Sequence, residues 1–507
     1  MENRAQFGSR AGFIFAAVGS AIGLGNIWRF PAVAYDNGGG AFFLPYLFAL
    51  LTAGIPLLIL EFAIGHKYRG SAPLSLARVK RGGEWIGWWQ ISISFVIATY
   101  YAVIIAWALA YTYFSFKLEW GTDTTPFLIE NYLKVGGTET FGSFVPGVLI
   151  PLILVWLIVL GILFAGVKKG IEMATKIMIP LLVVLFLIIV IRAVTLDGAM
   201  EGLNQFFKPD WSMITNGKVW VAAYGQIFFS LSIGFAIMIT YSSYLPKKSD
   251  ITNSAFITGF ANSGFELLAG FGVFAALGFM AAQQGVPVNE VVKGGVILAF
   301  SIFPTIINQL PAFNEIFGIL FFVSLTLAGL TSLISIVETY IAGIQEKFNI
   351  SRAKAVTFGG GVTAIISLAF ATQNGLNLLD VADYFINQFG VAMAGLFEVI
   401  FIAWFAKQLK PLQAHADSVS DIRLGAWWRI SLSIITPVVL GYMMFDNLRQ
   451  NLTAEYGGGD YPREFLFKYG WTVAIGAILV GVLITLKPWK GQALEQPAFE
   501  DKKEEVS

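Results

Sequence analysis

The residues that could carry chemistry in this 507-residue chain gather in one apolar segment near its N-terminus. The segment reads Gly23-Leu24-Gly25-Asn26-Ile27-Trp28-Arg29-Phe30-Pro31, within a run that is otherwise apolar from Ala11 to Tyr35. Glycine and proline disfavour a continuous helix, so the sequence predicts a break that leaves backbone carbonyl and N–H groups without partners. In hydrocarbon, each such group costs several kcal/mol unless something polar fills the gap.

A second segment has the same character. It reads Gly225-Gln226-Ile227-Phe228-Phe229-Ser230-Leu231-Ser232-Ile233-Gly234-Phe235 and lies five predicted membrane spans after the first. Because five is odd, a repeat of that length is inserted upside down. Paired interrupted helices in such halves predict a binding site near the middle of the membrane.

The chemistry of the gap favours an anion and a hard cation together. Half-helix N-termini attract a carboxylate, and free carbonyls and hydroxyls suit a monovalent cation. Thr331 and Ser332 add adjacent hydroxyls to another apolar helix. Since no carboxylate cluster lies nearby, these oxygens favour Na⁺ over Ca²⁺ or Mg²⁺.

Structural explanations compete at each of these positions. Glycines in membrane helices more often mark close packing than breaks, and hydroxyls often bond to their own helix carbonyls. Arg29 shifts the balance toward a functional site, because an arginine within a span needs a partner or water.

These segments belong to a chain built for a bilayer, in which 56% of residues are hydrophobic and 13% are charged. A span needs roughly 20 apolar residues, and the apolar runs predict an all-α polytopic membrane protein of about twelve transmembrane helices, with one domain over residues 1–507. The predicted spans are 11–35, 41–65, 86–116, 144–166, 174–194, 219–244, 254–282, 313–343, 355–372, 380–406, 424–446 and 467–486.

Composition also excludes several classes of function. The chain has no Cys and two His residues, which excludes disulfides, iron–sulfur clusters and cysteine zinc sites. A net charge of +1 gives no reason to expect nucleic-acid binding, and no motif of an enzyme is present in context. Lys and Arg gather in the loops of one side, which predicts that both termini are cytoplasmic. The polar tail over about 492–507 is predicted to be disordered.

The residues Gly23 to Pro31, followed by Asn37-Gly38-Gly39-Gly40-Ala41-Phe42, resemble the signature of the neurotransmitter:sodium symporter family, and in particular its bacterial amino acid transporters. The resemblance continues through Gly225 to Ser232, Ala328 to Ser332 and Asp380 to Tyr384. It implies two inverted five-helix repeats, at about 11–194 and 219–406, in which helices 1 and 6 are broken. Two peripheral helices would follow at about 424–486.

The resemblance further implies two Na⁺ sites and no organic cofactor. The first site would use the carbonyl of Ala21, the side chains of Asn26 and Asn262, both the carbonyl and the hydroxyl of Ser230, and the carboxylate of the substrate. Other members carry Thr where Ser230 stands, so the hydroxyl is kept. The second site would use the carbonyls of Gly19, Ile22 and Ala328 and the hydroxyls of Thr331 and Ser332. An ion shared with the substrate would couple the two binding events reciprocally.

Gly23 stands where amine transporters of the family carry Asp, so the expected substrate brings its own carboxylate. We expect import of a neutral amino acid with an aliphatic or aromatic side chain, by alternating access across the cell (inner) membrane. Tyr101 would bind the substrate carboxylate. The full set of expected substrate contacts is Ser20, Ala21, Leu24, Gly25, Ile97, Tyr101, Phe229, Ser230, Ser232, Phe235, Ser332 and Ile336.

By the same resemblance, Arg29 and Asp383 would close the outer side of the site above a lid of Tyr101 and Phe235. Arg4 would pair with Glu346 on the inner side, beside Ser243 and Tyr244. Glu266 lies within a span where chloride-dependent members carry Ser, which predicts chloride independence and a possible proton carrier. The alternative is a neutral buried Glu266 with a structural hydrogen bond. A transporter-like amino acid sensor or a passive channel are the competing functions.

Overall fold

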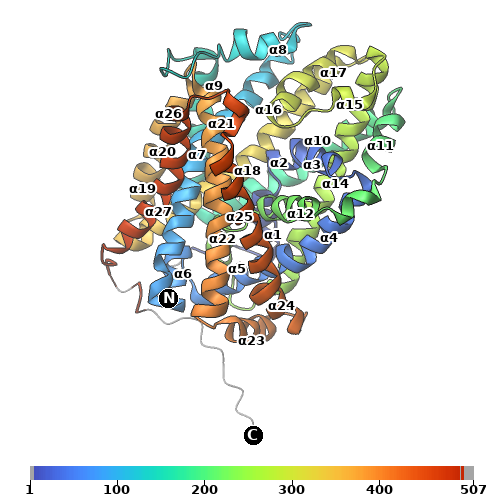
Figure 1. Ribbon diagram of the computed structural model, residues 1–507. Helices are drawn as coiled ribbons and strands as arrows, with labels where there is room; N and C mark the ends of the chain where they lie inside the picture. Colours follow the sequence, from blue (N-terminus) through green and yellow to red (C-terminus); the bar gives the residue numbers. More distant parts are fainter. Residues whose placement is uncertain (1–4, 492, 496–507) are drawn as a thin grey trace.

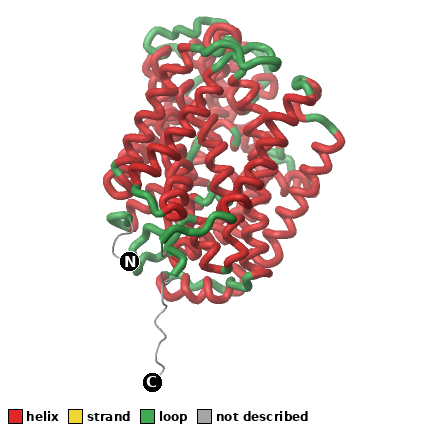
Figure 2. The backbone as a smooth tube through the Cα atoms, turned by 90° about the vertical axis from the view of Figure 1, so that its left-hand side faces the viewer, coloured by secondary structure: helices red, strands yellow, loops and turns green. Residues whose placement is uncertain are grey.

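The computed structural model describes residues 5–491 and 493–495, and in these ranges the regular structure is helical, without a named strand. Long helices run side by side along one axis and loops gather at the two ends (Figure 1, Figure 2). The helices long and apolar enough to span a membrane are Gly40–Tyr68, Arg81–Phe114, Pro146–Phe164, Val167–Val194, Ile251–Gln284, Asn314–Phe348, Arg352–Ala371, Gly375–Phe405, Ala426–Gly459 and Arg463–Thr485. The predicted all-α polytopic class is confirmed.

The first span is broken where its glycines predict. Helix α1 (Arg10–Ala21) ends at Ile22, whose backbone is extended, and the chain resumes as α2 (Leu24–Trp28) and α3 (Phe30–Asp36). The two halves are bent by 55°. The carbonyls at the end of α1 are therefore released from helical bonding in the middle of the protein.

The sixth span is broken as well. Helix α12 (Gly217–Ser230) is separated from α13 (Ile237–Ser242) by six residues without helical structure. Within this break Ser232, Gly234 and Ala236 have φ values of 54°, 80° and 65°, which L-residues other than glycine rarely adopt. The described residues thus contain ten helices that can span a membrane, or eleven with the bent first span, and a twelfth span through α12 and α13 stays a prediction. The division into inverted repeats stays a prediction.

Burial separates an inner group of helices from an outer group. In the most apolar stretch of each inner helix, 78% of the residues are buried; these helices are Gly40–Tyr68, α7 (Glu84–Phe114) and α14 (Ile251–Gln284). In the outer helices the share is 33% or less; these are α9 (Pro146–Phe164), α10 (Met173–Val194) and α27 (Thr472–Thr485). The outer helices expose large apolar side chains, including Leu157, Ile177 and Leu483. Large apolar side chains exposed along membrane-length helices fit a lipid environment.

The described chain begins and ends on the same side of the molecule. The Phe7 N–H donates to the Tyr244 carbonyl, and the Lys490 N–H donates to the Lys347 carbonyl at the end of α18 (Asn314–Phe348). Helices α6 (Ala72–Val79) and α23 (Leu409–Val419) lie at this end, opposite α8 (Thr124–Pro126) and α17 (Phe303–Gln309) (Figure 1). Arg4 and most of the predicted disordered tail lie outside the described residues.

Candidate functional site

A cavity of about 320 Å³ lies where the two broken helices meet α7 and α18. Every residue predicted to contact the substrate lines it: Ser20, Ala21, Leu24, Gly25, Ile97, Tyr101, Phe229, Ser230, Ser232, Phe235, Ser332 and Ile336. Asn26, Arg29 and Asp383, predicted for ion binding and gating, line it too. The sequence-based list omitted further lining residues, among them Trp28, Tyr100, Ile104, Gln226 and Asp380.

Glycine at position 23 keeps one wall of the cavity open. A Cβ atom placed on Gly23 would lie 3.1 Å from both the Tyr101 hydroxyl and the Ser332 hydroxyl. The Tyr101 hydroxyl accepts a bond of 3.3 Å from the Leu24 N–H, and its own proton can point into the cavity. A side chain at position 23 would crowd these hydroxyls, so the glycine leaves room beside them on the cavity wall.

Three neutral polar side chains from three helices meet behind the first break. Asn26 Nδ2 donates to Asn262 Oδ1 at 2.8 Å and to Ser230 Oγ at 3.3 Å, and Asn262 Nδ2 donates to Ser230 Oγ at 2.6 Å. All three side chains are buried. Their oxygens are uncharged ligands of the kind that suit a monovalent cation, and Ala21 ends α1 on the wall of the same cavity.

A second group of oxygens surrounds Ser332 of α18. Its hydroxyl lies 3.4 Å from the Gly19 carbonyl, 3.3 Å from that of Ser20 and 3.5 Å from that of Ile22. Thr331 Oγ1 lies 3.0 Å from the Ala328 carbonyl. Oxygens about 2.4 Å from a cation the size of Ca²⁺ or Na⁺, at right angles to one another, are roughly 3.4 Å apart. The spacing therefore fits a cation between α1 and α18.

Glu266 of α14 is completely buried beside the first group of oxygens. It accepts hydrogen bonds from the Tyr46 hydroxyl and, at 2.6 Å, from the Gln226 amide. Tyr46 also bonds to the Ser263 hydroxyl at 2.9 Å. Arg29 is close enough to interact electrostatically with Glu266, but among the described residues no ion pair joins the two side chains. Two donors thus converge on a single carboxyl.

The outer side of the cavity is not sealed by its predicted pair. The Arg29 guanidinium stacks 4.7 Å from the centre of the Phe229 ring, while Asp383 accepts a bond of 2.8 Å from Asn387. Among the residues that the structure describes, no ion pair joins Arg29 to Asp383 and no ring contact joins Tyr101 to Phe235. Closure by these residues stays a prediction for another conformation.

On the predicted inner side, where the described chain begins and ends, lies a buried ion pair that sequence reasoning missed. Glu338 of α18 is buried and receives Arg352 through two bonds, of 3.0 and 2.7 Å, and the Tyr244 hydroxyl at 2.8 Å. The sequence gives no direct sign of this pair, because Arg352 begins the next helix, α19 (Arg352–Ala355), beyond the end of α18. Glu346, the predicted partner of Arg4, accepts from the N–H and hydroxyl of Ser71 at 2.9 and 2.6 Å.

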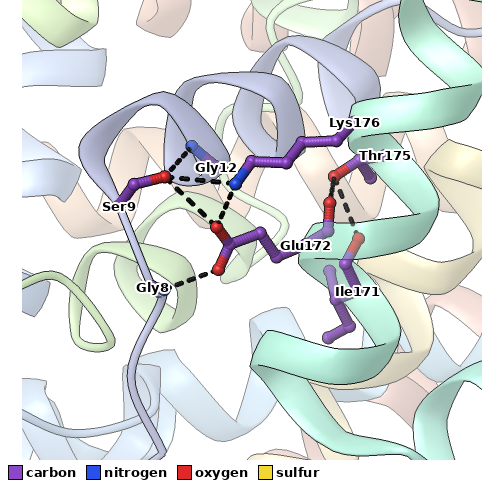
Figure 3. A network of polar contacts seen from close by, with 7 residues as sticks. All are labelled: Gly8, Ser9, Gly12, Ile171, Glu172, Thr175 and Lys176. Carbon is purple, nitrogen blue, oxygen red and sulfur yellow. Dashed lines mark hydrogen bonds and ion pairs between the residues drawn. The ribbon is translucent and has the colours of Figure 1, made fainter.

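The start of α1 is fixed to the helix beside it. Glu172, at the end of η5 (Val167–Glu172) before α10, accepts from the Gly8 N–H at 2.6 Å, the Ser9 hydroxyl at 3.2 Å and the Lys176 ammonium at 2.5 Å (Figure 3). A Cβ atom on Gly12 would lie 2.2 Å from a Glu172 oxygen. The carboxylate thus fits against bare backbone and fixes the start of α1 to the neighbouring helix.

Loss of the inner ion pair is expected to open that side. In Glu338→Gln, Arg352 loses its charged partner, and a charge-assisted bond contributes about 1.5–3 kcal/mol, so we expect at least a tenfold shift toward inner accessibility. Because the chain has no Cys, a single Ser335→Cys, buried beside Tyr241, reports accessibility to a membrane-impermeant thiol reagent added from the inside. Lys354→Gln, on the same side and exposed, is the control. Equal labelling in both variants would contradict the closing role.

Comparison with known proteins adds to this geometry. A model of the sodium:neurotransmitter symporter family matches residues 4–141 and 123–490 of the chain. An uncharacterized sodium-dependent transporter of Methanocaldococcus jannaschii is 43% identical over 491 residues, which is 96% of this chain and 99% of that protein.

More distant relatives have named substrates. The bovine sodium-dependent dopamine transporter is 30% identical over 94% of this chain and 74% of its own length. The human sodium- and chloride-dependent neutral and basic amino acid transporter B(0+) is 28% identical over 94% of this chain and 84% of its own length. The sequence similarity therefore extends over the segments that form the cavity and both oxygen groups.

Proposed function

Because the chain belongs to the sodium:neurotransmitter symporter family, a family of sodium-dependent transporters, we propose that it imports a neutral, hydrophobic amino acid together with Na⁺. The observation that carries the proposal is the cavity of about 320 Å³ between the two broken helices, with an oxygen group on each side. A zwitterion and a cation can both be bound there by backbone and neutral side chains.

The identity of the substrate follows from the walls of the cavity. Its apolar lining includes Ile97, Phe229 and Ile336, which suits an aliphatic or aromatic side chain. Gly23 leaves the Tyr101 hydroxyl on the cavity wall open to a carboxylate, whereas an amine substrate without a carboxylate would leave this hydroxyl without an anion. The relatives include a dopamine transporter and an amino acid transporter. The family fold therefore serves both classes of substrate, and the residues that line the cavity determine which class binds.

The coupling of Na⁺ to substrate rests on shared ligands. Asn26 and Ser230 line the cavity and also belong to the first oxygen group, so a Na⁺ held there would lie beside the substrate carboxylate. Each would then strengthen the binding of the other by the same factor. The second Na⁺ would join α1 to α18 through Ser332, Thr331 and the carbonyls of Gly19, Ile22 and Ala328, and would stabilise the conformation in which the inner side is closed.

The free energy available is sufficient for accumulation. Moving one charge through 100 mV supplies about 2.3 kcal/mol, so two Na⁺ ions supply about 4.6 kcal/mol before any chemical gradient. That corresponds to more than a thousandfold accumulation, at about 1.4 kcal/mol per tenfold. A proton returning outward through Glu266 would reduce the net charge moved to about one per cycle.

We further propose that both termini face the cytoplasm and that transport in the cell membrane does not need chloride. Lys and Arg concentrate in the loops on the side where the described chain begins and ends, which favours a cytoplasmic location. The buried Glu266 supplies a negative charge where chloride-dependent members carry a serine.

Uptake into proteoliposomes under an imposed Na⁺ gradient tests the proposal. We expect neutral hydrophobic amino acids to accumulate when Na⁺ is outside, and accumulation to vanish when K⁺ replaces Na⁺ or when an ionophore collapses the gradient. Accumulation that ignores the Na⁺ gradient would refute coupling. Specific binding with no uptake would support a sensor, and a current that follows the substrate gradient alone would support a channel.

A further inference from the structure

Two carboxyl groups lie buried behind the second broken helix. Glu61 of α5 (Ile55–Tyr68) is 0% exposed and Glu398 of α22 (Ala392–Ile400) is 1% exposed. Neither lines the cavity, and neither takes part in the function proposed above. Buried acids in a membrane protein are costly and call for an explanation.

Each carboxyl has one oxygen bonded and one without a partner. Glu61 Oε1 accepts a bond of 2.8 Å from the Gly234 N–H, inside the break between α12 and α13. Glu398 Oε2 accepts a bond of 2.5 Å from the Gln90 amide of α7. The other two oxygens, Glu61 Oε2 and Glu398 Oε1, are buried without any hydrogen bond. An unpaired buried oxygen of this kind marks a missing donor.

The two carboxyls belong to one cluster. A Cβ atom on Gly234 would lie 3.0 Å from the Val391 carbonyl and 3.4 Å from the Gly395 N–H, and Gly395 is one turn before Glu398. The residue that donates to Glu61 therefore rests on the helix that carries Glu398, and the two acids interact electrostatically.

No cation among the described residues contacts either acid. Several titratable groups on the helices packed around them have partners elsewhere: His66 with His415, Lys67 with the Pro411 carbonyl, Glu84 with Lys347, Tyr224 with Thr52, Tyr241 with Ser335, Glu266 with Tyr46 and Gln226, Asp417 with the Leu424 N–H, and Asp446 with Arg449. The Tyr100 hydroxyl of α7 is buried without a hydrogen-bond partner and bonds to neither acid. The cluster therefore has no counter-charge for two carboxylates.

A shared proton resolves the conflict. Two carboxylates in one low-dielectric site cannot both ionise without a large cost, so one of such a pair keeps its proton. A protonated carboxyl donates through its O–H, and an ionised one accepts. One proton between Glu61 Oε2 and Glu398 Oε1 would satisfy both unpaired oxygens and halve the charge.

We propose that Glu61 and Glu398 form a proton-binding site that holds one proton between them and thereby stabilises the broken turn of the sixth span. Loss of the proton leaves two like charges, which push Glu61 away from the Gly234 N–H. Ser232 and Phe235 of this turn line the cavity. Protonation of the Glu61–Glu398 pair therefore determines how well these two residues are held in position in the binding site. The inference does not depend on Na⁺ coupling.

Thermal unfolding in detergent, without substrate or ion gradient, tests the site. All variants are made in a Glu266→Gln background, so that the buried Glu266 carboxyl of α14 does not contribute to the pH dependence. The folded pair binds a proton that the unfolded chain releases, so stability falls as the pH rises. We expect the unfolding temperature to fall by several degrees between about pH 6 and about pH 9, and to stay flat once Glu398→Gln is added. Glu290→Gln, an exposed acid, should leave the fall intact.

Infrared difference spectra between the same two pH values give a second readout, which detects the protonated carboxyl directly and does not depend on the unfolding temperature. The Glu266→Gln protein should show a protonated-carboxyl C=O band that disappears at high pH, and Glu398→Asp, which keeps an acid in place, should retain it. Absence of the band in Glu266→Gln, or a pH-dependent unfolding temperature unchanged by Glu398→Gln, would overturn the proposal. Failure of Na⁺-driven uptake would bear on the transport proposal alone.

Discussion

Replacing Asn26 by alanine is expected to raise the Na⁺ concentration for half-maximal uptake by at least tenfold. Asn26 bonds to both Asn262 and Ser230 and lines the cavity, so its loss removes one proposed Na⁺ ligand and disorders the other two. A bond to a charged group contributes about 1.5–3 kcal/mol, which is about ten- to more than a hundredfold in affinity. Because Na⁺ and substrate bind reciprocally, the apparent affinity for substrate should fall as well.

The measurement is uptake against Na⁺ concentration in proteoliposomes, at fixed and at saturating substrate. Asn37→Ala is the matched control, since Asn37 is the residue directly after α3 and its side chain bonds to the Val33 carbonyl of that helix, away from the oxygen groups. We expect Asn37→Ala to keep the original Na⁺ dependence. A Na⁺ dependence that Asn26→Ala leaves unchanged, in protein that still binds substrate, would remove Asn26 from the ligand set.

Local sequence features were enough to predict where the chain departs from helix. Gly23 and Gly25 mark the first break, and Ser230 to Phe235 mark the second, where glycine and polar side chains interrupt an apolar run. The extent of the second break was less accessible. Ala236 has a positive φ of 65°, an unfavourable conformation for alanine that the surrounding packing imposes, and no local pattern indicates it.

Side-chain contacts between residues far apart in the chain could not be predicted from the sequence. Arg352 and Glu338 are on successive helices, and only the bend between them brings the two charges together. The Glu61 and Glu398 carboxyls are separated by most of the chain, and each is an isolated acid in its own span. Arg29 shows the converse case, because its predicted partner Asp383 lines the same cavity but a ring of Phe229 receives the guanidinium in this conformation.

The second large effect is expected from Glu266→Ser, which should make uptake depend on chloride. The substitution removes a carboxyl that accepts from Tyr46 and Gln226 and leaves two donors facing a space without an acceptor. Each unsatisfied donor costs about 1–3 kcal/mol, and a chloride ion can fill the space, accept both bonds and restore the negative charge near Arg29. We expect uptake to fall at least tenfold in chloride-free buffer, by about 1.4 kcal/mol per tenfold, and to recover with chloride.

Glu266→Gln distinguishes the loss of the negative charge from the opening of a space that an ion could fill. Glutamine nearly fills the volume of Glu266 and still offers one acceptor, so this variant has no room for an ion and should be equally active, or equally impaired, with and without chloride. If charge alone matters, Glu266→Gln is impaired and Glu266→Ser recovers only with chloride. If Glu266→Ser is indifferent to chloride while folded and able to bind substrate, then Glu266 serves only to bond Tyr46 and Gln226, and it does not replace chloride.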